Sequence, residues 1–240
     1  MRTTMCASPH DRPDPDFSER FYQTHARRYA EVAHQFLQSI YIKSSHPALK
    51  SDTDLLERLR DLVPRGRGLD AGCGAGARDV HDFWQKGYDI QGVDAVAENI
   101  REAKALHPEI ADRVALADLR QPIDFPDASF DFVICNGVIQ HIAPLIVFEV
   151  TLCEFARVLK PSGILQLLFK NGRGVKTVYD RDYGAERSFQ LYDENDVLQT
   201  LRSYGLELVE AESPEVLGGI MYFTDPKPMD HCVFYVRRRG

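Results

Sequence analysis

Three glycines at alternating positions are the first feature of this sequence that points to chemistry. Gly72, Gly74 and Gly76 lie in the stretch RGLDAGCGAGARDV, after a short apolar run and before a helix-like pattern. Glycine lets the backbone approach a ligand closely, because it has no side chain. Gly72, Gly74 and Ala77 also match the dinucleotide pattern Gly-x-Gly-x-x-Ala. Taken alone, the loop predicts contact with a dinucleotide pyrophosphate or with the amino-acid end of another nucleoside cofactor.

Polar residues that follow the apolar runs favour the second ligand. Asp70 lies two residues before the first glycine, where its carboxylate would repel a phosphate but attract a cationic amino group. Asp94 ends the second apolar run, where its carboxylate would accept hydrogen bonds from ribose hydroxyls. Asp118 ends the third, where it would accept a hydrogen bond from an adenine amino group. Asn136 and His141 follow the fourth apolar run, where a dehydrogenase would have its catalytic residues. This difference disfavours a dehydrogenase.

Five segments in order carry a resemblance to a known family. With LDAGCGAG, GVDAV, LADL, FDFVICNGVIQHI and RVLKPSGIL, the chain resembles the class I S-adenosylmethionine-dependent methyltransferases over roughly residues 17–240. The resemblance implies S-adenosylmethionine as cofactor. It also implies that the glycines approach the methionine part of the cofactor and that Asn136 lies below it. By the same resemblance, Asp94 would hold the ribose and Asp118 would meet the adenine. Ala95 and Leu119 would pack on the two faces of the adenine.

Strand-like and helix-like patterns alternate along the middle of the chain, which predicts an α/β fold. Apolar runs at 67–73, 88–94, 113–118, 130–136 and 161–170 are separated by helical patterns at 77–87, 97–107 and 145–160. This order favours a parallel sheet with helices on both faces. The resemblance further implies a Rossmann-like sheet of seven strands, mostly parallel, whose antiparallel C-terminal strand lies beside the fifth.

The two ends of the chain differ from this middle part. Residues 1–16 are polar and rich in proline, which predicts a mobile tail before a single domain at 17–240. An apolar stripe indicates a helix over about 17–43, and residues 17–50 resemble the lid helix of small-molecule methyltransferases.

Towards the C-terminus, we expect a loop-rich segment at 171–190, a helix at 193–205, and strands at 206–213 and 230–238 joined by a long linker.

Aromatic and basic residues suggest where the cofactor and a methyl acceptor would be enclosed. Tyr22 and Tyr29 share one face of the predicted lid helix, where they would close over the cofactor or pack as core aromatics. Tyr183 and Arg187 precede the last helix, and Arg187 could bind an anionic acceptor with two hydrogen bonds. The alternative for Arg187 is a surface ion pair.

Methyl transfer from a sulfonium is an in-line displacement, so alignment supplies most of the catalysis and no metal site is expected. A general base is needed only where the acceptor loses a proton. His141, after the fourth strand, is the candidate base. The alternative is that His141 packs beneath the cofactor or binds the scaffold.

The composition disfavours a nucleic-acid-binding protein and a protein with a membrane partner. The 240 residues carry a formal net charge of −7, which disfavours a dedicated nucleic-acid binder. Five scattered cysteines, with no apolar run of signal-peptide or membrane-spanning length, favour a cytoplasmic protein without a membrane partner.

We therefore expect a methyltransferase that acts on an oxygen, nitrogen or carbon atom of a small molecule. The alternatives are an RNA or tRNA nucleoside methyltransferase, an NAD-dependent oxidoreductase, and a cofactor-binding scaffold without turnover. The sequence does not decide whether the protein forms a homo-oligomer.

Overall fold

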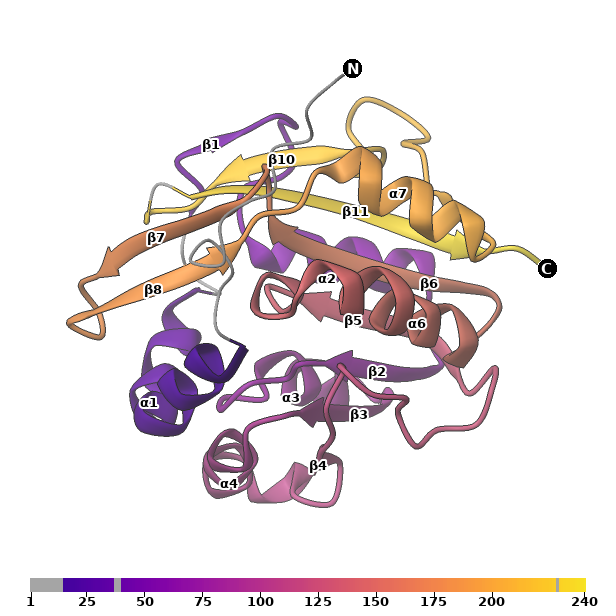
Figure 1. Cartoon of the computed structure of the whole chain (residues 1–240). Helices are drawn as coiled ribbons and strands as arrows, with labels where there is room; N and C mark the ends of the chain where they lie inside the picture. Colours follow the sequence, from indigo (N-terminus) through magenta and orange to yellow (C-terminus); the bar gives the residue numbers. More distant parts are fainter. Residues whose placement is uncertain (1–14, 37–39, 228) are drawn as a thin grey trace.

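A large mixed sheet forms the centre of the molecule (Figure 1). The computed structural model describes residues 15–36, 40–227 and 229–240. Five parallel strands run in the order β4-β3-β2-β5-β6, and the antiparallel β11 lies beside β6. This arrangement confirms the predicted Rossmann-like fold with its antiparallel C-terminal strand. The strands are β2 (Arg67–Ala71), β3 (Asp89–Asp94), β4 (Val114–Leu116), β5 (Phe130–Asn136), β6 (Leu159–Lys170) and β11 (Asp230–Arg238).

Helices cover both faces of the sheet, and each face has its own apolar core. Alternate residues of β5 supply the two cores: Val133 packs with one and Phe132 with the other, and both are fully buried. A strand buried on both faces must be apolar throughout, which is why the run FDFVICN was recognisable. One core contains residues of α6 (Leu152–Val158) and α7 (Glu194–Ser203), and the other contains residues of α2 (Asp52–Leu62), α3 (Arg78–Gln85) and α4 (Ala97–Leu106).

The segment predicted as a loop at 171–190 is a β-hairpin, so that prediction was wrong. Strand β7 (Val175–Asp180) pairs antiparallel with β8 (Ala185–Gln190) over six residue pairs. β-Branched residues in VKTVYD and a left-handed Gly184 at φ 63° in the turn are the signals that favour it. Figure 1 shows the hairpin reaching away from the main sheet towards the N-terminal helix.

In the described residues, the sheet has nine strands, where the resemblance implied seven. The segment expected to be a linker contains β10 (Met221–Thr224), which pairs with β11, and β1 (Lys43–Ser44) pairs with the outer edge of β10. A short β9 (Leu206–Leu208) pairs with the other half of β11. The strand expected at 206–213 is therefore shorter than predicted, and β10 and β1 are strands that were not predicted.

The N-terminal helix α1 (Pro15–Phe36) ends earlier than the predicted limit near residue 43. Ile40, assigned to its apolar stripe, lies outside the helix with 73% of its surface exposed. In the lid segment predicted over 17–50, the described residues belong to α1 and to residues 40–50, which contain β1. Residues 1–14 of the predicted tail lie outside the described residues.

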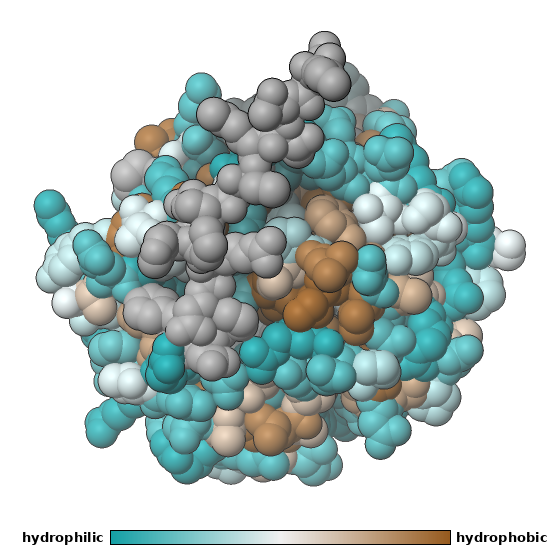
Figure 2. All heavy atoms as spheres, in the orientation of Figure 1, coloured by the Kyte–Doolittle hydropathy of each residue, from teal (hydrophilic) through white to brown (hydrophobic). Residues whose placement is uncertain are grey.

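The outer surface shown in Figure 2 is mostly hydrophilic, with apolar side chains gathered in small patches. Among the described residues, no helix is both long and apolar enough to span a bilayer.

Close contact between two central strands depends on a glycine. A Cβ atom built on Gly68 of β2 would lie 2.1 Å from the Cζ atom of Phe132 on β5, far inside van der Waals contact. Phe132 is fully buried and packs against Phe83, so its ring has little room to move away.

We expect Gly68→Ala to lower the free energy of unfolding by about 1–3 kcal/mol, because it overpacks this contact. Urea unfolding measures the loss. A cycle with Phe132→Leu provides the control, since a smaller side chain at position 132 relieves the clash. Strictly additive losses in the double variant would contradict this cause.

Candidate functional site

Two cavities meet at the carboxyl ends of β2 and β5. The large cavity has a volume of about 710 Å³ and the small cavity about 110 Å³. In a parallel α/β sheet the carboxyl ends of the strands form the usual ligand crevice. The residues that line both cavities are Tyr22, Tyr29, Gly72, Asn136, Gly137 and His141.

The glycine loop, residues 72–77, forms the boundary between the cavities, and its shape explains two of its glycines. Gly72 has φ 100°, and a Cβ there would lie 2.3 Å from a methyl group of Val138. Gly74 has φ 65°, and its Cβ would lie 2.7 Å from the ring of Tyr29. Both positions therefore require glycine for conformation and for space. The backbone N–H of Gly72 donates to the Val93 carbonyl at 2.8 Å, which ties the loop to β3.

Asp94, at the end of β3, fixes the loop from the side of the small cavity. Its carboxylate accepts hydrogen bonds from the backbone N–H of Gly74 at 2.9 Å, from that of Val96 at 2.9 Å and from the Asn99 amide at 3.0 Å. Burial raises the pKa of Asp94, and the three hydrogen bonds act against that rise. The small cavity is lined by the predicted residues Asp94, Ala95, Asp118 and Leu119 together with Gly72, Gly74 and Asn136.

Asp118 connects the far end of the small cavity to the N-terminal helix. Its carboxylate accepts hydrogen bonds from the backbone N–H and from the Nε atom of Arg120, each at 2.9 Å. The Arg120 guanidinium also forms an ion pair with Glu19 of α1 at 3.1 Å. Helix α1 is thus fastened at the end of the cavity where the sequence places the adenine.

Buried carboxyl groups lie along the floor of the large cavity, which Gly76 also lines. Asp70 is 4% exposed, and burial, followed by the neighbouring Asp79, raises its pKa well above the ordinary value. Asn136 donates to Asp79 at 3.2 Å and accepts from Gln166 at 3.0 Å, so its amide is held in one orientation. Burial also raises the pKa of the Cys73 thiol, which argues against Cys73 as a nucleophile.

A chain of hydrogen bonds joins α1 to the floor of the site. The guanidinium of Arg187 donates to the hydroxyl oxygen of Tyr22, and that hydroxyl lies 3.3 Å from Nε2 of His141. An arginine only donates, so the single hydrogen of Tyr22 points to His141, and Nε2 accepts it. Nδ1 of His141 then carries the ring proton and donates to the hydroxyl of Ser18 at 3.0 Å. The rings of Tyr22 and Tyr29 meet edge to face at 5.0 Å.

His141 is therefore neutral and hydrogen bonded through both ring nitrogens. Burial, then the charges of Arg187 and Lys170, hold its pKa well below the ordinary value. The predicted role as a general base needs a free lone pair on Nε2, and in this arrangement Tyr22 takes that lone pair.

Arg187 lies inside the site, so the alternative that it forms a surface ion pair is wrong. Its side chain is 13% exposed and forms an ion pair with Asp180 of β7 at 3.0 Å. Like Tyr183, it lines the large cavity. Its guanidinium carbon lies 4.7–5.3 Å from the centres of four aromatic rings, those of Phe21, Tyr22, Tyr183 and Phe189.

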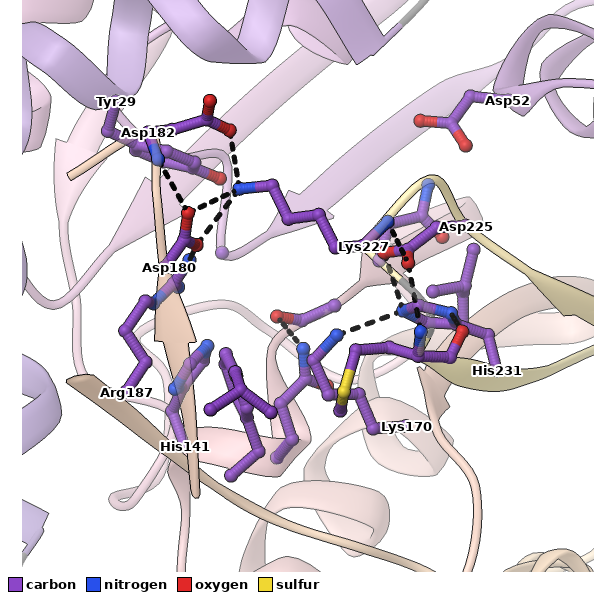
Figure 3. A pocket seen from close by; sticks show the side chains of 18 of the residues that line it. Tyr29, Asp52, His141, Lys170, Asp180, Asp182, Arg187, Asp225, Lys227 and His231 are labelled. Atoms are coloured by element: carbon purple, nitrogen blue, oxygen red, sulfur yellow. Dashed lines mark hydrogen bonds and ion pairs between the residues drawn. The ribbon is translucent and has the colours of Figure 1, made fainter. Parts of the chain in front are cut away.

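Several other charged residues around the large cavity were not predicted from the sequence (Figure 3). Lys170 ends β6, and its Nζ atom lies 3.1 Å from Nε2 of His231 on β11. Lys227 forms ion pairs with Asp180 at 2.9 Å and with Asp182 at 2.7 Å. A lysine at the end of the apolar run ILQLLFK was a usable signal, because the other parallel strands also end in site residues.

One cluster of potential metal ligands lies outside both cavities. His81, His107 and Glu109 bring three ligand atoms within 4.8 Å of one another. The Nε2 atom of His81 lies 2.8 Å from the Glu109 carboxylate, and the two imidazoles stack with centres 3.9 Å apart. No metal site was expected from the sequence, because methyl transfer from a sulfonium needs no metal.

Comparison with known proteins agrees with this arrangement of strands and loops. Residues 69–167 match the model of a methyltransferase domain, and this range contains the glycine loop, Asp94, Asp118 and His141. This segment of the chain is therefore similar to a methyltransferase domain.

Two curated relatives have names that give them different substrates. The chain is 28% identical over 164 residues to phosphoethanolamine N-methyltransferase 2 of Caenorhabditis elegans, which covers 66% of this chain and 36% of the relative. It is 33% identical over 102 residues to the mitochondrial ubiquinone biosynthesis O-methyltransferase of Mus musculus, which covers 40% of this chain and 26% of that protein. The match thus spans about a quarter to a third of these relatives.

Solved structures share the fold over nearly the whole chain. The 1,6-didemethyltoxoflavin-N1-methyltransferase of Burkholderia thailandensis, with bound S-adenosylhomocysteine, superposes with a TM-score of 0.66 at 19% identity over 100% of this chain and 94% of its own. The [4+2]-cyclase SpnF superposes with a TM-score of 0.64 at 16% identity over 95% and 97%. Proteins with different reactions in their names thus share the fold, so the reaction must be argued from the site.

We expect Arg187→Met to loosen α1, because it removes a hydrogen bond to Tyr22 and four cation–aromatic contacts. Backbone amides of residues 18–32 should exchange with deuterium roughly 10–100 times faster, as the loss of about 1–3 kcal/mol predicts. Hydrogen–deuterium exchange mass spectrometry measures this. Arg173→Met, at a side chain 72% exposed, is the matched control and should leave α1 unchanged. Equal exchange in both variants would contradict the assignment.

The low pKa of His141 predicts a pH-dependent stability difference. The unfolded chain takes up a proton at this histidine below about pH 6.5, whereas the folded protein does not, so protonation favours unfolding. The stability advantage of the native protein over His141→Gln should therefore shrink as the pH falls from 7.5 to 5.0. The change is at most about 1.4 kcal/mol per pH unit.

Urea unfolding of both proteins at several pH values measures this difference, and effects of other titrating groups cancel in the comparison. A difference that stays constant over the range would contradict the neutral, buried state of His141.

Proposed function

We propose that this protein transfers a methyl group from S-adenosylmethionine to a small-molecule acceptor. The observation that carries the proposal is the shared wall of the two cavities, formed by Gly72, Asn136 and the residues of α1 and η3 (Ile139–His141) that line both. The small cavity has the residue pattern for an adenosine, and the large cavity opens directly from its inner end. A donor and an acceptor bound in these cavities would meet at the junction.

We assign the cofactor residues as follows, on the strength of the resemblance and the lining of the cavities. Asp94 holds the ribose, Asp118 meets the adenine amino group, and Ala95 and Leu119 pack on the adenine faces. The glycines of the loop and Asn136 contact the methionine part. These residues, with Gly72 and Asn136 at the junction, line one or both cavities.

Asp70 fits the amino group of the cofactor. It lies in the large cavity, close to the junction, and burial already disfavours its charged form. An ammonium group placed beside it would compensate the buried carboxylate, and a phosphate would not. This favours an amino-acid end over a pyrophosphate at the glycine loop.

Helix α1 acts as the lid of this site in our proposal, and residues 17–240 act as one domain. Tyr29 lies against Gly74, and Tyr22 is held between Arg187 and His141. His141 accordingly works as a positioning residue that fixes Tyr22 over the junction. A closed lid excludes water and aligns the two reactants, which is the main requirement of an in-line displacement.

The volume and the lining of the large cavity indicate the size and chemical character of the acceptor. Its volume of about 710 Å³ lies within the range of small-molecule sites, and part of it is taken by the methionine end of the cofactor. Phe189, Tyr183 and Tyr179 line it beside the charged residues. S-adenosylmethionine supplies the activated methyl group, and the protein supplies enclosure and alignment.

Calorimetry with S-adenosylhomocysteine and with NADH tests the cofactor assignment. We expect binding of S-adenosylhomocysteine and no comparable binding of NADH. Asp94→Asn should weaken S-adenosylhomocysteine binding about tenfold or more, because it removes charge from the group that shapes the loop and holds the ribose. Asp112→Asn, outside both cavities, is the matched control and should bind normally. Tight NADH binding without S-adenosylhomocysteine binding would overturn the proposal.

A further inference from the structure

Lys170 is a buried cation on the wall of the large cavity. It ends β6 with 7% of its surface exposed, and its Nζ atom lies 3.1 Å from Nε2 of His231. Figure 3 shows the two side chains pointing toward each other at the wall of the cavity. The position, at the carboxyl end of a parallel strand beside the junction, places the ammonium within the acceptor space.

His231 contributes no charge that would neutralise this ammonium. Its Nδ1 atom lies 2.9 Å from the Met229 carbonyl, and a carbonyl only accepts, so Nδ1 carries the ring proton. Nε2 is then an acceptor and receives a hydrogen from Lys170. Burial, followed by the charge of Lys170, keeps the pKa of His231 well below the ordinary value. The pair therefore carries one net positive charge.

The carboxylates of Asp180 and Asp225 each have direct contacts with other groups. Asp180 is bound by Arg187 at 3.0 Å and by Lys227 at 2.9 Å. Asp225 accepts backbone hydrogens from Lys227 and Met229, and its second oxygen is 3.8 Å from His231. In the part of the chain that the structure describes, no carboxylate lies within 4.0 Å of the ammonium of Lys170.

A buried ammonium without a direct counter-ion is costly unless a ligand compensates it. Burial lowers the pKa of Lys170 to about 8, with Asp225 acting against the shift. At neutral pH the group is therefore mainly charged and available to an anion.

Arg187, which the sequence suggested as the anion site, is engaged elsewhere. It donates to Asp180 and to Tyr22, and aromatic rings surround its guanidinium. The ring of Phe189 lies between the two cations, with its centre 4.9 Å from the Arg187 guanidinium carbon and 4.6 Å from the Lys170 Nζ atom. Phe189 thus offers an apolar wall directly beside the ammonium of Lys170.

We propose that Lys170, held in place by His231, binds a carboxylate or phosphate group of the methyl acceptor, whose carbon skeleton packs against Phe189. This inference rests on the proposed methyltransferase function and adds the chemical class of the acceptor, an organic anion. The ammonium fixes the acceptor at one end, so that its nucleophilic atom can face the junction with the cofactor cavity.

Calorimetry with benzoate and with phenyl phosphate, each added to the protein saturated with S-adenosylhomocysteine, tests the subsite. We expect at least one probe to bind the native protein and to bind Lys170→Met about tenfold or more weakly. The probe with the higher affinity identifies the anionic group. Lys104→Met, an exposed residue of α4 outside both cavities, is the matched control and should bind like the native protein.

Binding of S-adenosylhomocysteine and the thermal melting point check that Lys170→Met is folded. Equal probe affinity in Lys170→Met and the native protein, or no binding of either probe to the saturated native protein, would overturn the anion subsite alone. Failure of the native protein to bind S-adenosylhomocysteine would overturn the methyltransferase proposal on which it rests.

A pH series gives a second readout. Benzoate keeps its charge between pH 7 and 9.5, so its affinity should fall as Lys170 loses its proton around pH 8. Lys170→Arg, which stays charged, should keep the affinity at pH 9.5. A decline that persists in Lys170→Arg would assign the titration to another group. The charged or titratable groups facing Lys170 are His141, Lys176, Arg187, Asp225, Lys227 and His231.

Discussion

The carboxylate of Asp94 holds together the parts on which the site depends. It binds the backbone of the glycine loop through Gly74, and that of the chain leading into α4 through Val96. The loop can take this path only because Gly72 and Gly74 adopt left-handed conformations with no room for a side chain. One buried acid thus sets the boundary between the two cavities, and α1 closes against the same loop through Tyr29.

Charge is distributed differently on the two sides of that boundary. The small cavity contains acids that accept hydrogen bonds from the backbone or from Arg120, an arrangement suited to hydroxyl and amino groups of a nucleoside. The large cavity contains the ion pairs of Asp180 with Arg187 and Lys227, and it also contains the cation Lys170, whose direct partner is the neutral His231. A neutral His141 lies at the junction, with both ring nitrogens bound to α1. In our proposal, acids bind the polar groups of the donor, and Lys170 binds an anionic group of the acceptor.

Much of the fold could be predicted from local patterns, because the buried parallel strands are apolar throughout and end in polar residues. The residues proposed to bind the cofactor were selected for the same reason. The hairpin of β7 and β8 was missed because its strands lie outside the main sheet and carry many charges. The pairing of Lys170 with His231 joins residues 61 positions apart and depends on the antiparallel register of β6 and β11, which sequence spacing alone does not specify.

In our proposal, donor and acceptor meet where the two cavities join, beneath α1. A crystal structure with S-adenosylhomocysteine tests this arrangement. We expect the adenosine in the small cavity between Asp94 and Asp118, with the sulfur at the junction facing the large cavity. Adenosine bound elsewhere, or a sulfur directed away from Tyr22 and His141, would contradict it.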